Sequence, residues 1–314
     1  MLSNSSILVL GAGELGMAVL RGLADRRKDD QSSDLAVLLR PESIHSTDSH
    51  RTSMIEELRA LDIRLVAGDL QKNSEADLAS IFQPFRTVIG CTGFAAGSQV
   101  QLKIARAVLA AKIERFVPWQ FGVDYDVIGK GSSQELFDEQ LEVRALLRAQ
   151  HGTDWLIIST GIFTSFLFEP AFGVVDLERG LVHALGSWDN AVTVTTAEDI
   201  GRLTAAILHT EPSLKNQVIY TAGDTITYRQ LADIVETVLV RKIQREQWTV
   251  RKLTAELART PTESLQKYRL VFAEGRGVAW PKYRTFNEKN GILVTDVEEW
   301  LRRYTIRKPP ENQS

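Results

Sequence analysis

The first half of the chain alternates short apolar runs with stretches of helical periodicity. Six runs rich in Leu, Ile and Val precede residue 161. Runs that are apolar on both faces are typical of strands in a parallel sheet covered by helices on both sides. The pattern therefore predicts successive βαβ units and an α/β fold with a doubly wound parallel sheet, a Rossmann fold. The six predicted strands are ILVLGA (7–12), LAVLLR (35–40), RLVAGD (64–69), TVIGC (87–91), RFVPWQ (115–120) and DWLIIST (154–160).

The pattern loosens after residue 160. An aromatic segment at 163–172 is followed by a strand and helix at 191–208, a seventh strand at 216–222 and a helix at 225–239. From residue 242 onward mainly helix and loop are expected, and the basic residues of 241–259 interleave with Glu246 and Glu256 as on a solvated helix face. We therefore predict a nucleotide-binding domain at 1–160 and a smaller C-terminal α/β substrate-binding region at 161–314, with 191–222 returning to the first sheet.

A glycine motif follows the first strand directly. Gly11, Gly13 and Gly16 form GxGxxG, with Glu14 and Leu15 between them, and the motif opens a predicted helix. In this setting the first glycine makes a tight turn, the second lets the backbone approach a pyrophosphate, and the third lets the helix pack on the strand. The amides at the helix N-terminus then face the phosphates. The motif predicts a bound dinucleotide.

The end of the second strand indicates which nicotinamide cofactor is bound. A carboxylate there holds the ribose hydroxyls of NAD, whereas a cation holds the 2′-phosphate of NADP. The strand ends in Arg40, and Ser43 adds a hydroxyl that can donate to the same phosphate. NADP(H) is therefore favoured over NAD(H). Two alternatives remain: Arg40 is a solvated strand end, or Glu42 accepts from a ribose hydroxyl.

Composition narrows the remaining classes. Of 314 residues, 44% are hydrophobic and 25% charged, which is typical of a globular chain. The formal charge of −3 argues against a nucleic acid or an anionic membrane as partner, so a small molecule is expected. The single cysteine, Cys91, fits a reducing compartment, and no metal cluster is apparent. The N-terminal apolar run is shorter than a signal-peptide core, and no run is long enough to span a membrane, so a cytoplasmic protein is expected.

Three later segments carry a resemblance to a known family. RFVPWQFGVD (115–124), STGIFTSFL (159–167) and AVTVTTAEDIG (191–201) resemble segments of the isoflavone-reductase-like and NmrA-like atypical short-chain dehydrogenases. The resemblance covers most of the chain. It implies an NADP-binding Rossmann domain, a small C-terminal substrate domain and a cleft between them.

The chain departs from this family at the position of the proton donor. The plant reductases carry a lysine in the helix after RFxPSEFGxD, and aligning Phe137 and Arg144 with the family segment puts Gln140 there. An amide does not transfer protons at neutral pH. Helical spacing places Gln140 on an apolar stripe and Glu139 away from it. Gln140 is interpreted either as a buried amide bonded to backbone or as a hydrogen-bonding group near the nicotinamide.

The YxxxK pair of ordinary short-chain dehydrogenases is also missing. Tyr125 is followed by Lys130 five residues later in a glycine-flanked loop, a spacing that does not match the pair; both are kept as catalytic candidates with Gln140. His183 is the only histidine kept as an outside acid or base. In doubly wound sheets the ligand lies beyond the carboxyl ends of the strands. The further cofactor candidates are therefore Cys91, Thr92, Gly93, Trp119, Gln120 and Phe121, and the substrate candidates are Phe121, Phe163, Phe166, His183 and Trp280.

Three functional hypotheses are kept. The first is what the family resemblance implies: an NADPH-dependent reductase of a small aromatic or heterocyclic compound in specialised metabolism. An imine or iminium is a suitable acceptor because hydride addition to it needs no concurrent protonation. The second is a redox-neutral cyclase or isomerase that keeps NADP bound. The third is a non-catalytic NADP sensor that binds a regulatory protein. The oligomeric state is expected to be a monomer or a homodimer.

Overall fold

The computed structural model describes residues 5–27 and 33–307. Contacts between residues divide the chain into two units, each assembled from several segments. Unit 1 comprises 1–120, 139–158 and 200–219, and unit 2 comprises 121–138, 159–199 and 220–314. Each unit is thus discontinuous in sequence.

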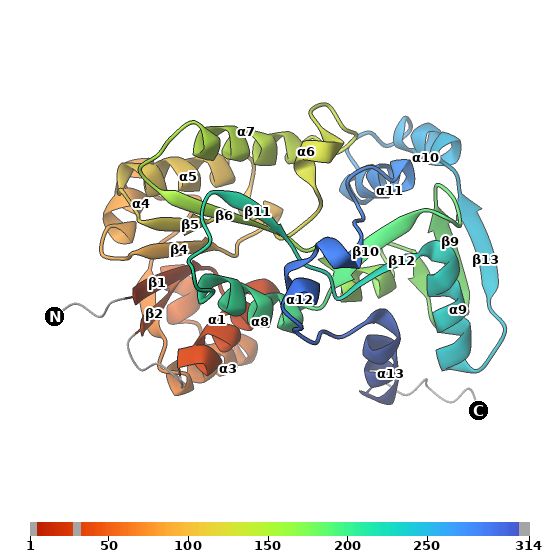
Figure 1. Ribbon diagram of the computed structural model, residues 1–314, viewed down its shortest axis with the longest axis horizontal. Coiled ribbons are helices and arrows are strands. Elements are labelled where there is room, and N and C mark those ends of the chain that lie inside the picture. The colour runs from red at the N-terminus through yellow and green to blue at the C-terminus, as the bar shows by residue number, and fades with distance from the viewer. Residues whose placement is uncertain (1–4, 28–32, 308–314) are drawn as a thin grey trace. The chain divides into compact units, whose positions relative to one another are not determined.

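Unit 1 is built on a seven-stranded parallel sheet in the order β11-β6-β5-β4-β1-β2-β3. Helices α4, α5 and α7 lie on one face, and α1, α3 and α8 on the other (Figure 1). The predicted doubly wound α/β fold is confirmed. The strands are β1 (Ser5–Leu10), β2 (Ser33–Leu39), β3 (Arg64–Ala67), β4 (Thr87–Gly90), β5 (Arg115–Val117), β6 (Asp154–Ser159) and β11 (Gln217–Tyr220); the helices are α1 (Glu14–Arg27), α2 (Pro41–Ile44), α3 (Ser49–Ala60), α4 (Glu75–Phe82), α5 (Val100–Ala110), α7 (Leu136–Arg148) and α8 (Ala197–Leu208), with a 3-10 turn η1 (Phe94–Ala96).

Burial on both faces of this sheet explains the continuous apolar runs within its central strands. Leu8, Val9 and Leu10 are consecutive residues of β1, and all three are fully buried although their side chains alternate between faces. The strand lies between β2 and β4, with parallel register on each side. Parallel pairing brings the carboxyl ends of these strands to one edge of the sheet, where the glycine motif begins.

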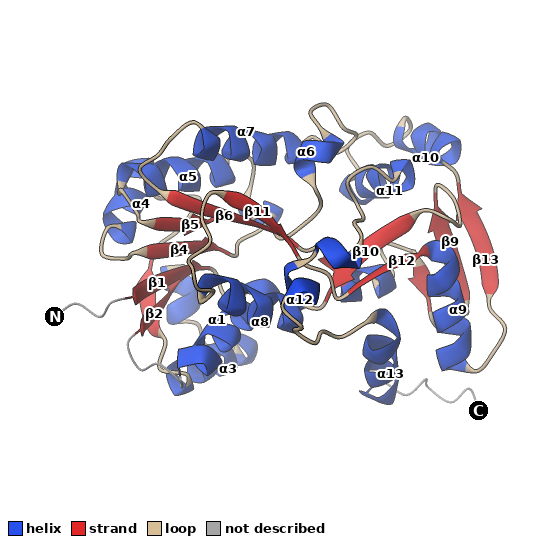
Figure 2. Cartoon of the chain, in the orientation of Figure 1, coloured by secondary structure: helices blue, strands red, loops and turns tan. Residues whose placement is uncertain are grey.

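Unit 2 contains two small sheets, in the orders β12-β10-β7 and β13-β9-β8 (Figure 2). Of the segment 191–222, β11 lies in the seven-stranded sheet, whereas β10 pairs in unit 2. The stretch 241–259 is not one solvated helix: it forms a strand and then α10, because its strand pairs in parallel with β9. The elements are β7 (Ile162–Phe163), β8 (Val175–Asp176), β9 (Leu181–Leu185), β10 (Ala191–Thr195), β12 (Asp224–Thr227), β13 (Gln244–Trp248), α6 (Tyr125–Ile128), α9 (Tyr228–Leu239), α10 (Val250–Leu257), α11 (Ser264–Glu274), α12 (Phe286–Lys289) and α13 (Val297–Arg307), with 3-10 turns η2 (Thr164–Phe168) and η3 (Lys282–Arg284).

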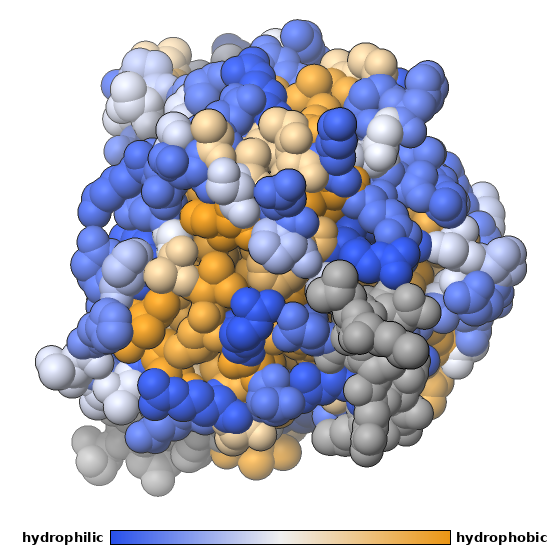
Figure 3. Space-filling model, turned by 90° about the vertical axis from the view of Figure 1, so that its left-hand side faces the viewer, coloured by the Kyte–Doolittle hydropathy of each residue, from blue (hydrophilic) through white to orange (hydrophobic). Residues whose placement is uncertain are grey.

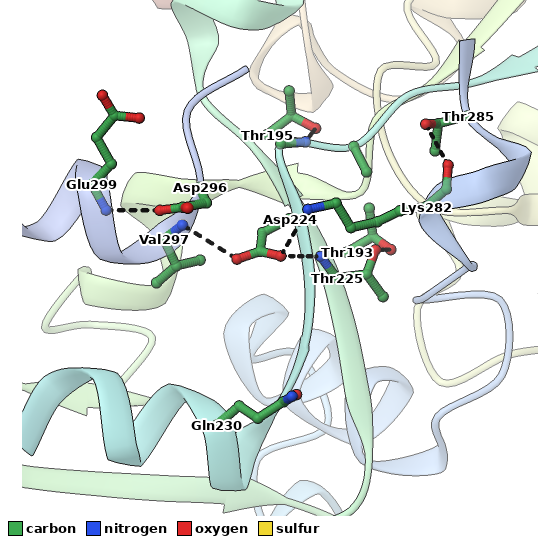
Figure 4. A network of polar contacts seen from close by, with 12 residues as sticks. Thr193, Thr195, Asp224, Thr225, Gln230, Lys282, Thr285, Asp296, Val297 and Glu299 are labelled. Carbon is green, nitrogen blue, oxygen red and sulfur yellow. Dashed lines mark hydrogen bonds and ion pairs between the residues drawn. The ribbon is translucent and has the colours of Figure 1, made fainter. Parts of the chain in front are cut away.

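A polar network around Asp224 ties the C-terminal elements of unit 2 to its sheet (Figure 4). The Asp224 carboxylate accepts from the backbone N–H of Thr225 at 2.9 Å and of Val297, the first residue of α13, at 3.4 Å. The Lys282 ammonium in η3 lies 3.6 Å from the same carboxylate. One aspartate therefore joins β12, η3 and α13.

Large exposed apolar side chains are unevenly distributed. All those among the described residues lie in unit 2, for example Val240 and Leu293. Figure 3 shows the face at the left of Figure 1, where apolar residues gather in the middle and polar residues surround them. Within 5–27 and 33–307, no helix is long and apolar enough to cross a bilayer.

Candidate dinucleotide site and aromatic cluster

The glycine motif forms a tight loop between β1 and α1 in unit 1. Gly11 has φ +96°, and a Cβ there would lie 2.5 Å from the Thr92 hydroxyl oxygen. A Cβ on Gly16 would lie 2.1 Å from the carbonyl oxygen of Gly11, so only glycine lets α1 approach the loop this closely. A Cβ on Gly13 would meet nothing within 4 Å. The loop conformation therefore requires glycine at positions 11 and 16. At Gly13 the space next to the backbone is open.

The space at Gly13 lies at the start of a regular helix. α1 runs for 14 residues from Glu14, and its first backbone amides have no partner within the helix. Glu14 is exposed and Leu15 is buried beneath the loop. An open backbone at a helix N-terminus is the arrangement that accepts a phosphate. The loop therefore fits the pyrophosphate of a dinucleotide.

The carboxyl end of β4 lies beside this loop. The Thr92 hydroxyl donates to the carbonyl of Leu10 at 2.8 Å, and the Cys91 backbone N–H donates to the same carbonyl at 3.1 Å. Burial raises the pKa of the Cys91 thiol, which disfavours the thiolate a nucleophile would need. Cys91 and Thr92 therefore hold the ends of β1 and β4 together.

Trp119, after β5, closes the next part of this edge. A Cβ on Gly93 would lie 2.8 Å from the indole of Trp119, so the ring rests directly on the Gly93 backbone. The Trp119 ring also packs edge-on against Phe94, with centroids 4.6 Å apart. The structure thus brings together the glycine loop, Cys91 to Gly93 and Trp119, as the sequence predicted for the ends of adjacent parallel strands.

Arg40 and Ser43 flank the end of β2. Arg40 is exposed, and no hydrogen bond or ion pair of its guanidinium is found among the described residues. Ser43 is half-buried in the one-turn helix α2, and its backbone N–H donates to the Arg40 carbonyl at 2.8 Å. Glu42, the alternative ribose acceptor, is paired with Lys72 at 3.2 Å. The exposed guanidinium of Arg40 suits an anionic ligand.

Gln140 lies on α7 and is fully buried. Its backbone carbonyl accepts from the Gln120 side chain at 2.9 Å, and Gln120 in turn accepts from the Arg144 guanidinium at 2.7 Å. Neither the amide nitrogen nor the amide oxygen of Gln140 has a hydrogen-bond partner in the described part of the chain. The side chain is therefore buried as expected, but it is not bonded to backbone.

Glu139, next to Gln140, was predicted to face away from the core. In the structure it is buried. Its carboxylate accepts from the backbone N–H groups of Gln99 and Gln101, both at 2.9 Å, and of Leu102 at 3.3 Å. These groups lie at the N-terminus of α5, where amides lack partners within the helix. The prediction was wrong because helical spacing cannot reveal a cap supplied from another helix.

The remaining catalytic candidates, Tyr125 and Lys130, both lie in unit 2. Tyr125 is buried and begins the short helix α6, which replaces the loop expected there. Lys130 is exposed in the following turn. Phe121 is buried at the beginning of the segment that unit 2 contributes after β5. Asp124 caps α6 and accepts from the Tyr220 hydroxyl at 2.6 Å, so its carboxylate holds this segment in place.

His183 and Trp280 are engaged inside unit 2. His183 lies with Nδ1 2.7 Å from the Gly173 carbonyl oxygen and Nε2 3.3 Å from the Glu246 carboxylate, and its ring stacks on Trp248. The buried Trp280 indole donates to the carbonyl of Thr221 at 3.0 Å. Both side chains therefore already contribute to packing within the unit.

Phe163 and Phe166 are half-buried, and Phe166 belongs to an aromatic cluster in unit 2. Phe166 stacks on Phe172 with centroids 4.4 Å apart and meets Tyr268 of α11 edge-on at 6.4 Å. Phe137 contacts both Tyr268 and Tyr125 edge-on. The ring of Phe272 packs edge-on against Phe172. We call the six connected rings the aromatic cluster: Tyr125, Phe137, Phe166, Phe172, Tyr268 and Phe272.

Tyr268 was not among the sequence candidates. Burial, together with the neighbouring Tyr125, raises the pKa of the Tyr268 phenol, which therefore stays protonated at neutral pH. A protonated phenol can donate a hydrogen bond to a ligand. No local motif marks Tyr268. Its partners lie more than a hundred residues earlier in the chain.

Comparison with known proteins places the chain in a family. The model of the NmrA-like family matches residues 3–301. An NmrA-like family domain-containing oxidoreductase of Gibberella moniliformis is 43% identical over 306 residues, covering 97% of this chain and all of that protein. Phenylcoumaran benzylic ether reductase Pyrc5 of Pyrus communis is 25% identical and matches 78% of each chain.

Solved structures share the fold at low sequence identity. A crystal structure of isoflavone reductase aligns with a TM-score of 0.79 at 18% identity, covering 96% of this chain and 99% of the other. The binary complex of leucoanthocyanidin reductase with NADPH from Vitis vinifera aligns with a TM-score of 0.77 at 17% identity, covering 96% and 100%. The Rossmann-like architecture is thus common to all of these chains.

Proposed function

Because the chain belongs to the NmrA-like family, we propose that it is an NADPH-dependent oxidoreductase acting on a small aromatic or heterocyclic compound. The observation that carries the proposal is the loop at Gly11, Gly13 and Gly16, whose open backbone at the N-terminus of α1 fits a pyrophosphate. The oxidoreductase of Gibberella moniliformis, similar over its whole length, supports the reaction class. The NADPH complex of a structural neighbour supports the cofactor.

The residues of unit 1 fit each part of NADPH. The glycine loop and the first amides of α1 would hold the pyrophosphate, and Arg40 with Ser43 would hold the 2′-phosphate. Gly93 and Trp119, at the carboxyl ends of β4 and β5, would border the nicotinamide. When bound, the nicotinamide supplies a hydride from C4. The protein's part is then to position the acceptor and exclude water.

Gln140 determines which acceptors suit the reaction. At neutral pH its amide has no proton to transfer, but it can donate or accept a hydrogen bond. We infer that the acceptor needs no proton from this position, as for an iminium or a similarly activated group. Glutamine in place of the family's lysine also favours the second candidate, a redox-neutral cyclisation or isomerisation with NADP bound. A non-catalytic NADP sensor remains the third candidate.

The aromatic cluster supports the proposed substrate class. Phe166 is half-buried, so part of its ring surface can contact a ligand, and the Tyr268 phenol is protonated and available as a donor. Planar aromatic substrates stack favourably on such rings, with about 0.5–1.5 kcal/mol per ring pair beyond area burial. We propose that the substrate's ring packs on Phe166 while a polar substituent accepts from Tyr268.

The test combines binding and turnover. Calorimetry with NADPH establishes whether the cofactor binds, and depletion of NADPH against a panel of cyclic iminium salts, aryl imines and enones identifies the acceptor. The Gln140→Lys variant is compared with wild type on the accepted compound. We expect slower turnover of a cationic acceptor by the variant, because the added ammonium repels it. Faster, pH-dependent turnover would refute the proton-independent reaction.

Two outcomes would select another candidate. Product formed with NADP⁺ and without stoichiometric loss of NADPH would replace the reductase by the redox-neutral enzyme. Tight NADPH binding with no product from any panel member would favour the sensor, whose further test is a search for a protein partner. Absence of NADPH binding by a folded chain would remove all three.

A further inference from the structure

Four charged side chains lie beyond the ends of β2 and β3 in unit 1, and the charge of Arg40 acts on Asp69. These neighbouring strands are in register at Leu39 and Ala67, and the backbone N–H of Gly68 donates to the Leu39 carbonyl at 2.9 Å. The pairing brings the residues after Leu39 close to those after Gly68. We call the four side chains the charged cluster: Arg40 and Glu42 from the β2 side, and Asp69 and Lys72 from the β3 side.

Lys72 joins the two sides of the cluster. Its Nζ lies 3.2 Å from Oε1 of Glu42 and 3.7 Å from Oδ2 of Asp69. The hydrogen bond and charge of Glu42, with the charge of Asp69, raise the pKa of Lys72. Lys72 therefore remains a cation at neutral pH, and its side chain is 73% exposed.

The two carboxylates differ in how firmly they are held. Asp69 is buried, and its carboxylate accepts from the backbone N–H of Gln71 at 2.8 Å and of Lys72 at 3.1 Å. Burial opposes its ionisation, but these bonds and the charges of Lys72 and Arg40 outweigh it, so its pKa is lowered. Glu42 is 62% exposed, and its carboxylate is held by a hydrogen bond to its own backbone and by Lys72, which together lower its pKa. It is less buried than Asp69, although it too has a backbone bond. Glu42 is therefore the carboxylate that an incoming anion can displace.

We propose that Lys72 is a second cation for the 2′-phosphate of NADPH, and that Glu42 is a resident competitor that sets the preference between NADPH and NADH. The proposal rests on the proposed function. In the absence of a 2′-phosphate, Glu42 neutralises Lys72 and can accept a hydrogen bond from a ribose hydroxyl. A phosphate dianion takes the place of Glu42 beside Lys72 and meets Arg40 on the other side. Arg40 and Lys72 thus bind the 2′-phosphate of NADPH, whereas Glu42 binds the 2′-hydroxyl of NADH.

The experiment measures calorimetric affinities of the full chain for NADPH, NADH and 2′,5′-ADP. Lys72→Ala should weaken NADPH and 2′,5′-ADP about fivefold, the size of one charge-assisted hydrogen bond reduced by solvent exposure, and change NADH less than about twofold. Glu42→Gln should tighten NADPH about threefold because it removes the repulsion, and weaken NADH slightly because a neutral amide oxygen replaces the charged acceptor of the ribose hydroxyl. The salt dependence of 2′,5′-ADP binding should also decrease in Lys72→Ala.

The matched control is Lys215→Ala, which breaks another exposed lysine–aspartate pair of unit 1, to Asp154 at the start of β6. It should leave all three affinities unchanged. Equal weakening of NADPH and NADH by Lys72→Ala, or no change in either, would overturn the proposal while leaving the proposed function intact. If the folded wild type bound neither dinucleotide, both the proposed function and this inference would be wrong.

Discussion

Replacing Gln140 by methionine should stabilise the ligand-free protein. Gln140 is fully buried and neither atom of its amide has a hydrogen-bond partner among the described residues. An unpaired amide in the interior costs about 1–3 kcal/mol relative to water. Methionine has a similar length and a similar helix propensity, and its thioether carries no such penalty. Repacking costs up to about 1 kcal/mol, so we expect a net gain of about 1–2 kcal/mol.

Urea denaturation measures this gain, with Gln101→Met as the matched control. Gln101 is also buried in unit 1, but its amide donates to the Thr92 carbonyl at 2.8 Å. Its replacement leaves that carbonyl without a donor and should destabilise by about 1 kcal/mol. Opposite signs for the two glutamines support the unpaired amide of Gln140.

A loss of stability in Gln140→Met similar to that of Gln101→Met would refute the reasoning, because it would show that the Gln140 amide is paired in solution. Turnover provides the second measurement. A more stable but slower Gln140→Met enzyme would indicate that the amide is retained for its contact with cofactor or substrate. A more stable enzyme of unchanged rate would remove Gln140 from the proposed site.

Three further predictions concern unit 1. Gly13→Val should fold, because the added side chain enters open space, yet lose calorimetric binding of NADPH and NADH alike; unchanged affinity would exclude the loop as the pyrophosphate site. Arg40→Ala should weaken NADPH by about 1.5 kcal/mol and leave NADH nearly unchanged, and equal losses would contradict its role. Glu139→Ala should lower the free energy of unfolding by about 3 kcal/mol, since three charge-assisted bonds at the N-terminus of α5 are lost, whereas the exposed Glu56→Ala should stay within about 0.5 kcal/mol in the same urea titration.

The sequence by itself determined the elements whose signals are local. The strand ending at Leu10 is apolar at each position from Ile7 onward because both faces of its sheet are covered, and that continuity can be read without knowing the covering helices. Gly11 and Gly16 follow it at the spacing that the turn and the helix contact require. Parallel pairing then places the carboxyl ends of the strands at one edge of the sheet. The association of Thr92 and Trp119 with the glycine loop was therefore also predictable.

The tertiary structure alone decided the contacts made across long stretches of sequence. Glu139 looked solvent-facing, since periodicity describes one helix, but its carboxylate serves amides of α5 38 residues away at Gln101. The strand Gln244–Trp248 is polar and exposed, and pairing with β9 rather than its own composition makes it a strand.

The candidate site shows the same division. Arg40 could be found at the end of a strand, but Lys72 joins it only because β2 and β3 are neighbours in register. Tyr268 has no motif and reaches Phe137 through the packing of α11. A sequence records which residues are available for such contacts. Whether two distant residues meet depends on the entropic cost of closing the loop between them and on the packing of the elements that carry them. Neither quantity can be read from a local sequence pattern.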